Sequence, residues 1–184
     1  MTAHDPTVLP PGLPVPVDDG AADHLPGQAV PALTLPSTAG EPVDLAAAGG
    51  TLVLFCYPRT GRPGEDPPPG WDAIPGARGC TPETCAFRDH HGGFVDLGVR
   101  VLGLSTQTTA EQREMVERLA VPFEVLSDAD LRLARALGLP TFEVAGLTLI
   151  KRLTLVLDDG VVAHAFYPVF PPDRHAAEVL AWLR

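Results

Sequence analysis

The stretch GCTPETCAFRD, residues 79–89, places two cysteines five residues apart at the expected start of a helix. Thr81 is a good N-cap, and Pro82 suits the first helical position, where a missing N–H costs nothing. Cys80 then lies at the positive end of the helix dipole, which favours a thiolate over a thiol. The sequence therefore predicts that Cys80 is a nucleophile.

Composition narrows the classes of partner. The 184 residues are 45% hydrophobic and 20% charged, with a net charge of −10. An acidic surface argues against nucleic acid and anionic membranes as partners. No apolar run approaches the roughly 20 residues of a membrane span, and the N-terminus lacks the pattern of a secretory signal. We expect a soluble, cytoplasmic protein.

The chain contains three cysteines, Cys56, Cys80 and Cys85. They are too few, and odd in number, for a secreted disulfide framework, so they are catalytic, metal-binding or simply buried. Cys56 lies in the unbroken apolar run 52–57, which is typical of a central strand covered on both faces. We interpret Cys56 as a buried core residue.

Proline and glycine divide the chain. Residues 1–22 contain five prolines and no helical or strand period, which predicts an extended arm, with one domain over 23–184. Residues 59–79 contain five prolines and five glycines, so they form a long loop inserted in that domain. Trp71 and Ile74 give this loop apolar packing groups and favour an ordered one.

The remaining patterns alternate strands and helices. A capping-box pattern over 109–112 opens one helix, Ser127 or Asp128 caps the next, and Asp173 caps the last. The order is β-α-β-α-β-α, then a hairpin around 158–160, then α, which predicts an α/β sandwich with a mixed sheet. Strands are expected over 30–35, 42–45, 52–57, 99–104, 123–126, 149–157 and 161–166.

The spacing of Cys80 and Cys85 limits what the pair can do. Five residues apart on a helix, their Cα atoms are roughly 8–9 Å from one another, whereas a disulfide needs about 4.4–6.8 Å. A disulfide would require the first helical turn to unwind. Zinc is the alternative, with His90 and His91 as further ligands, but four ligands from one helix fit structural zinc poorly. Thiol–disulfide exchange normally uses C-x-x-C, which this chain lacks.

Arg152 is a cation inside the apolar stretch 149–157. Its guanidinium must reach water or an anion. Two interpretations stand: the side chain extends to the surface, or it is a fixed cation beside the Cys80 thiolate that lowers its pKa and stabilises charge during attack.

The motif GCTPETCAFRD resembles the peroxidatic segment of the peroxiredoxins, in particular the peroxiredoxin Q (bacterioferritin comigratory protein) branch. The similarity runs from about His24 to Arg184, and its other motifs occur in the same order along the chain. These are FCYP at 55–58, LGLST at 102–106, LSD at 126–128, and Arg152 before LVLD at 155–158.

The resemblance implies a thioredoxin-like fold, with a central mixed sheet flanked by helices, and a thiol peroxidase. Cys80 would attack the peroxide to give a sulfenic acid, Cys85 would resolve it as an intramolecular disulfide, and Arg152 would be the active-site arginine. The substrates would be hydrogen peroxide and organic hydroperoxides, and a thioredoxin-type dithiol would be the reductant. No cofactor or metal is implied, and we expect a monomer rather than a stable oligomer.

The chain departs from the family just before Cys80, where the usual threonine is replaced by Ala77. Thr60, close to Pro58, is the candidate for the missing hydroxyl. We hypothesise that the loop 59–79 covers Cys80 through Trp71 and Arg62 or Arg78. The alternative functions are a thiol–disulfide oxidoreductase and a non-catalytic redox sensor of the same fold.

Overall fold

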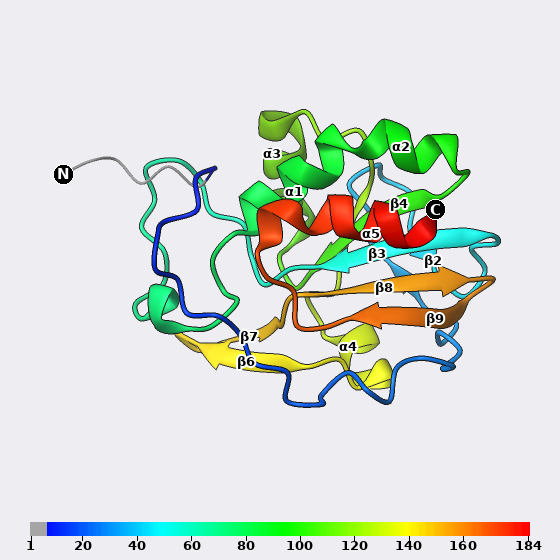
Figure 1. The fold of residues 1–184 in the computed structure, drawn as a ribbon, viewed down its shortest axis with the longest axis horizontal. Helices are drawn as coiled ribbons and strands as arrows, with labels where there is room; N and C mark the ends of the chain where they lie inside the picture. The colour runs from blue at the N-terminus through cyan, green and yellow to red at the C-terminus, as the bar shows by residue number, and fades with distance from the viewer. Residues whose placement is uncertain (1–6) are drawn as a thin grey trace.

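A central five-stranded sheet organises the computed structural model, which describes residues 7–184. The strand order is β5-β4-β3-β8-β9, and β3 pairs in parallel with β4 and antiparallel with β8 (Figure 1). The predicted α/β sandwich with a mixed sheet is therefore confirmed. The sheet strands are β3 (Thr51–Cys56), β4 (Arg100–Ser105), β5 (Val125–Ser127), β8 (Leu153–Asp158) and β9 (Val161–Phe166).

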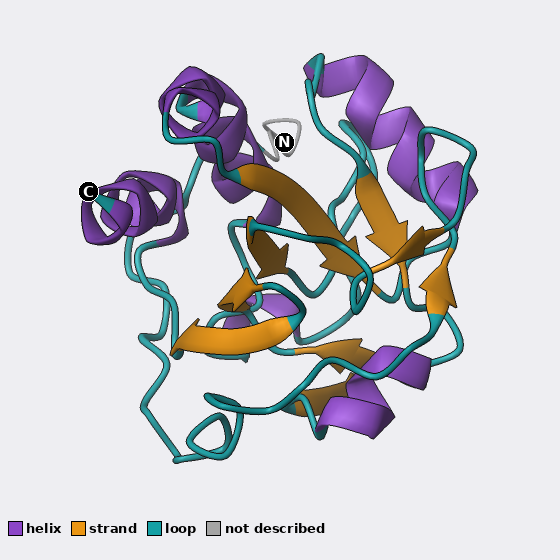
Figure 2. Cartoon of the chain, turned by 90° about the vertical axis from the view of Figure 1, so that its right-hand side faces the viewer, coloured by secondary structure: helices purple, strands orange, loops and turns teal. Residues whose placement is uncertain are grey.

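Helices cover both faces of this sheet (Figure 2). On one face lie α1 (Cys80–Asp89), α2 (His91–Asp96), α3 (Thr109–Leu119) and α5 (His175–Leu183). On the other face lies α4 (Arg132–Leu137). Because side chains alternate along a strand, β3 supplies both apolar layers. Val53 and Phe55 pack toward α1, whereas Leu52, Leu54 and Cys56 pack toward α4.

Cys56 has no accessible surface, as its position in the apolar run predicted. The expected hairpin between β8 and β9 is also present. Its turn places Asp159 at φ 46° and Gly160 at φ 76°, the left-handed conformations that such tight turns require. A Cβ on Gly160 would lie 2.6 Å from the Ala46 carbonyl oxygen, so this position needs glycine.

Several strand predictions were wrong in extent. The expected strand over 149–157 is two strands, β7 (Leu147–Ile150) and β8, separated at Lys151 and Arg152. The unpredicted β6 (Thr141–Val144) pairs with β7 in a separate hairpin. Near the N-terminus, β1 (Thr34–Leu35) and β2 (Val43–Asp44) are much shorter than expected.

Three predicted helix starts were also wrong. Thr81 is not the N-cap of α1: Gly79 is, at φ 104°, and Cys80 is the first helical residue. The capping box of α3 lies one residue earlier than predicted, between Thr108 and Glu111. Asp173 does not cap α5, because it lies in the short 3-10 helix η2 (Pro172–Arg174) before it.

Neither Ser127 nor Asp128 is the N-cap of α4, which is Leu131, but the Asp128 side chain does bind the first turn of this helix. The Asp128 carboxylate accepts from the backbone N–H groups of Leu133 at 3.0 Å and Ala134 at 2.8 Å. The helix α2 was not predicted, and the zinc candidates His90 and His91 mark its boundary with α1.

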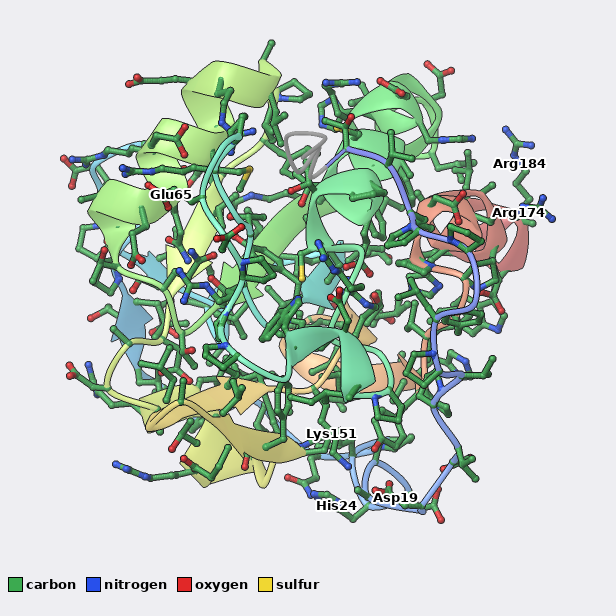
Figure 3. All side chains as sticks on the ribbon, turned by 90° about the vertical axis from the view of Figure 1, so that its left-hand side faces the viewer. Asp19, His24, Glu65, Lys151, Arg174 and Arg184 are labelled. Carbon is green, nitrogen blue, oxygen red and sulfur yellow. The ribbon has the colours of Figure 1, made fainter. Side chains whose placement is uncertain are left out.

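The N-terminal arm follows the surface beside the loop 59–79 and the β6–β7 hairpin (Figure 1). Its predicted range begins with residues 1–6, which lie outside the described residues. Asp19 anchors the arm, because it accepts from Lys151 Nζ at 2.8 Å and from the Tyr167 hydroxyl at 2.8 Å (Figure 3). The loop 59–79 is packed as predicted: Trp71, in the 3-10 helix η1 (Trp71–Ala73), is buried with Val144 and Leu149.

Candidate active site

Cys80 is buried at the first turn of α1, with 3% of its surface exposed. Gly79 fits there because its backbone is left-handed and neighbours crowd it: an added Cβ would lie 2.3 Å from Pro172 Cγ and 2.9 Å from Leu9 Cδ2. The Thr84 hydroxyl donates to the Cys80 carbonyl at 2.9 Å. The start of α1 is therefore packed between η2 and the arm.

Arg152 reaches this sulfur from the break between β7 and β8. Its Nη2 lies 3.2 Å from Cys80 Sγ, and the side chain is buried rather than extended to the surface. The same nitrogen donates to three backbone carbonyls just before Cys80, those of Gly76 at 3.3 Å, Ala77 at 3.4 Å and Arg78 at 3.0 Å. Of the two interpretations of Arg152, the structure supports the fixed cation beside Cys80.

Glu83 is the third charged group of the cluster, and the sequence did not identify it. It is fully buried, accepts from Arg152 Nη1, and has no hydrogen-bond partner for Oε1 among the described residues. The sequence could have indicated this burial, because Glu83 lies one turn before Phe87 and therefore on the same, buried face of α1. Burial raises the pKa of Glu83 to about 7, although Arg152 acts against this shift.

The pKa of Cys80 is set by opposing effects. Burial raises it above the ordinary thiol value, the Arg152 cation lowers it, and the Glu83 carboxylate raises it again. The backbone N–H of Arg59 also donates to the sulfur and lowers the pKa. Burial outweighs the cation, so the pKa of Cys80 lies above the ordinary thiol value. Arg152 instead limits the cost of forming a thiolate in a dry site.

A cavity of about 50 Å³ opens at Cys80. Its walls come from the start of α1, from the loop 59–79 and from the N-terminal arm. Trp71 and Arg78 contribute to the walls, as hypothesised, whereas Arg62 lies elsewhere and pairs with Glu65 and Glu114. The lining residues are Val8, Arg59, Gly61, Glu65, Asp66, Pro67, Pro68, Trp71, Ala77, Arg78, Gly79, Cys80 and Thr81.

Neither Ala77 nor Thr60 brings a hydroxyl to the Cys80 sulfur. Ala77 is fully buried and offers its carbonyl oxygen, 3.6 Å from Cys80 Sγ, but no hydroxyl. The Thr60 hydroxyl points to Gln107, donating to Oε1 at 3.1 Å, and is not part of the cavity wall. The structure therefore brings Cys80 and Arg152 together and directs the Thr60 hydroxyl away from the cavity.

Cys85 lies one and a half turns further along α1 and is half-buried, so both cysteines belong to the same intact helix. Burial raises the pKa of its thiol, while Arg88 and Arg118 lower it and Asp89 raises it. The zinc alternative gains no support: within residues 7–184, no three His, Cys, Asp or Glu side chains are grouped so that they could hold a metal ion. His90 Nδ1 instead contacts the Ala86 carbonyl at 2.9 Å.

Comparison with known families agrees with this geometry. The family model described as Redoxin matches residues 25–180. The chain belongs to the redoxin family. Its relatives place it in the peroxiredoxin Q branch, which the sequence motifs had indicated. Peroxiredoxin Q, chloroplastic, of Oryza sativa subsp. japonica is 32% identical over 160 residues, covering 86% of this chain and 66% of that protein. The chain thus spans just under two thirds of that relative's length.

Solved structures show the same fold. Peroxidoxin BcpB from Mycobacterium tuberculosis superposes with a TM-score of 0.68 and 30% identity, covering 87% of this chain and 96% of that one. The bacterioferritin comigratory protein of Xanthomonas campestris superposes with a TM-score of 0.64 and 26% identity, covering 93% and 96%. That structure is described in terms of its alkyl peroxide reduction activity and a trapped intermediate. The predicted thioredoxin-like peroxiredoxin fold is confirmed.

No helix in the described part of this chain is long and apolar enough to cross a membrane.

Proposed function

We propose that this protein is a thiol-dependent peroxidase in which Cys80 is the peroxidatic cysteine. The observation that carries the proposal is the contact of 3.2 Å between Arg152 Nη2 and Cys80 Sγ beside a small cavity. A buried cation fixed against a nucleophilic sulfur stabilises the thiolate and the charge that develops on the peroxide oxygens.

In the first step the Cys80 thiolate attacks the terminal peroxide oxygen. An S–O bond forms, the O–O bond breaks, and the leaving alkoxide or hydroxide takes a proton to give an alcohol or water. Cys80 becomes a sulfenic acid, so the thiol is oxidised as the peroxide is reduced. The Arg152 guanidinium and the Arg59 N–H both face the sulfur and support the reacting charge.

In the second step the Cys85 thiol attacks the Cys80 sulfenic acid, forming an S–S bond and releasing water. The first turn of α1 must unwind for the sulfurs to meet, because the intact helix holds the Cα atoms roughly 8–9 Å apart. Unwinding also breaks the contacts of the first turn with Leu9 and Pro172. A thioredoxin-type dithiol then reduces the disulfide and restores both thiols.

The substrates we propose are hydrogen peroxide and organic hydroperoxides. A cavity of about 50 Å³ exceeds the roughly 10–15 Å³ that one water molecule requires. It accommodates hydrogen peroxide, or the peroxide end of an organic hydroperoxide whose body stays outside. We propose a monomer as the active unit, because the attacking and the resolving cysteine lie on the same helix.

The loop 59–79 is proposed to control access to Cys80, because Trp71 and Arg78 form part of the cavity wall. Deleting residues 62–75 should change the rate constants for hydrogen peroxide and for cumene hydroperoxide by different factors. A folded deletion variant with unchanged kinetics toward both peroxides excludes this role.

The experiment that tests the function is peroxide consumption with thioredoxin as the reductant. Cys80→Ser should abolish turnover. Cys85→Ser should consume one equivalent of peroxide and retain a sulfenic acid on Cys80, which a dimedone adduct reports by intact mass. A wild-type protein that exchanges disulfides but ignores peroxide would instead identify a thiol–disulfide oxidoreductase, or a redox sensor if it forms the disulfide without turnover.

A further inference from the structure

Arg59 and Cys80 line the same cavity. The Arg59 backbone N–H, which lowers the pKa of Cys80, comes from a segment without regular structure. After the end of β3, the Tyr57 N–H still donates to the Leu104 carbonyl of β4 at 3.0 Å, but Pro58 has no N–H to pair and residues 58–60 lie outside the ladder. A donor on such a segment is useful only if another group holds the backbone in place. Holding the Arg59 backbone matters more here because Ala77 brings no hydroxyl that could donate to the sulfur instead.

Gln107 holds that backbone. Its Oε1 accepts from the Thr60 N–H at 2.8 Å and from the Thr60 hydroxyl at 3.1 Å, while its Nε2 donates to the Thr60 carbonyl at 3.2 Å. One side chain therefore satisfies the backbone donor, the backbone carbonyl and the hydroxyl of the residue next to Arg59. Both Gln107 and Thr60 are buried, so these bonds are protected from competing water.

Gln107 is itself firmly held between β4 and α3. Its backbone N–H donates to Ser105 Oγ at 3.3 Å, and its carbonyl accepts from the Ser127 hydroxyl at 2.6 Å. The next residue, Thr108, forms the capping box of α3 with Glu111. The position of the Gln107 amide is thus set by the sheet and by a capped helix rather than by the loop that it holds.

We propose that Gln107 is a positioning residue, which fixes the backbone of residues 59–60 so that the Arg59 N–H faces the Cys80 sulfur. This inference rests on the proposed function, in which Cys80 is the peroxidatic cysteine. It assigns the support of the thiolate to a backbone donor and a buried glutamine rather than to the Thr60 hydroxyl.

The expected consequence is a change in how Cys80 titrates. Three groups act on it besides burial: Arg152 and the Arg59 N–H lower its pKa, and Glu83 raises it. The neutral Tyr57 phenol lies nearby. Loss of the Gln107 bonds frees residues 59–60 and weakens the Arg59 donor, while the charged groups stay in place. The pKa of Cys80 then rises, and less thiolate is present at neutral pH.

Gln112 provides a matched control. It is also a buried glutamine, and its Nε2 donates to Ser105 Oγ at 3.0 Å and to the Leu126 carbonyl at 2.7 Å. It therefore ties α3 to the same region of the sheet and shares the Ser105 hydroxyl with the Gln107 backbone, but it makes no bond to Thr60. Replacing either glutamine by methionine keeps the length of the side chain and removes its hydrogen bonds.

The experiment measures the pH dependence of Cys80 alkylation by iodoacetamide in a Cys85→Ser protein, where Cys56 is fully buried. Gln107→Met should move the midpoint upward by about one pH unit and lower the rate constant for hydrogen peroxide about tenfold, the size of one hydrogen bond to a charged group. Thr60→Val, which keeps the backbone bonds, should shift the midpoint less. Gln112→Met should lower the melting temperature while keeping the wild-type midpoint.

A folded Gln107→Met protein with the wild-type midpoint overturns the inference, as does an equal shift in Gln112→Met. If Gln107→Met does not fold, Gln107→Asn carries the test, because its amide lies one methylene short of Thr60. Failure of the proposed function looks different: Cys80→Ser then retains turnover. The alkylation midpoint needs no turnover, so the two results are independent.

Discussion

Cys80 and Cys85 are five residues apart on one helix, yet their surroundings differ in kind. Cys80 is buried, with Arg152 and Glu83 both inside the protein. Cys85 is half-buried, with Arg88 and Arg118 at a surface where their carboxylate partners are partly exposed. A cation in a dry site acts strongly on a neighbouring thiolate, and a solvated one acts weakly. In the mechanism we propose, the fold therefore surrounds the attacking sulfur of Cys80 with buried charged groups, whereas the resolving sulfur of Cys85 has to be free to move.

Arg152→Met should produce the largest effect, because it removes the cation from Cys80. We expect the rate constant for hydrogen peroxide to fall about a hundredfold, the cost of removing one preorganised charged donor. Single-turnover stopped-flow kinetics in the Cys85→Ser protein measure this step. The matched control, Arg113→Met, removes an exposed guanidinium that donates to the Thr38 carbonyl. A fall of less than about threefold in Arg152→Met would mean that the cation only supports the fold.

Glu83 should make the stability of the protein depend on pH. Its folded pKa of about 7 lies above its ordinary value of 4.5, so the protonated form is favoured by folding. This contribution is complete below about pH 4.5 and is lost as the pH rises through 7, on the order of 3 kcal/mol in the free energy of unfolding.

Urea unfolding at pH 5 and pH 8 measures the Glu83 contribution. Glu83→Gln cannot titrate at this position and should show a smaller fall in stability between these two pH values. An identical fall in the wild type and in Glu83→Gln would assign the pH dependence to other groups.

Arg88→Met should affect Cys85 and leave Cys80 unchanged. Arg88 hydrogen-bonds the Cys85 thiol and is tied to α3 through the Leu119 carbonyl at 2.8 Å. Its removal raises the pKa of Cys85, because the nearer cation is lost while Asp89 still disfavours the thiolate. Arg118 remains and limits this rise. Disulfide formation after one equivalent of peroxide should slow about threefold at pH 7, a solvated ion contact being worth roughly 0.2–1 kcal/mol. An equal slowing of sulfenic acid formation contradicts the separation of the two sites.

The smallest effect is expected at the N-terminal arm. Val8 lines the Cys80 cavity but is 61% exposed, and Leu9 contacts the start of α1. Replacing both by alanine should raise the rate with cumene hydroperoxide relative to hydrogen peroxide by about twofold. This is far less than the roughly tenfold or greater discrimination that one methylene group produces in a closed pocket, because Val8 is exposed. Val17→Ala, an exposed residue of the same arm, is the control. If the double variant keeps the wild-type ratio of the two rates, the arm does not influence which size of peroxide reacts.

Local sequence patterns determined the sheet strands and the place of Cys80 at a helix start, because burial period and turn chemistry act over a few residues. The two β8–β9 turn residues and the apolar β3 run are examples of this. The strand over 149–157 was misjudged because apolar residues continue through Lys151 and Arg152, and only the contacts of Arg152 with Glu83 and with the carbonyls of residues 76–78 explain the break.

By itself the sequence determined the fold class, the pair of cysteines and, through its resemblance to the peroxiredoxins, the candidate chemistry. Only the tertiary structure decided which charged groups and hydrogen-bond donors surround Cys80 and set its pKa. Arg152 lies 72 residues away in the chain, and its contact with the sulfur depends on how β8 is placed beside β3. The same holds for Gln107, 47 residues from Thr60. Burial and the direction of a hydrogen bond are properties of packed elements, and no local pattern encodes them.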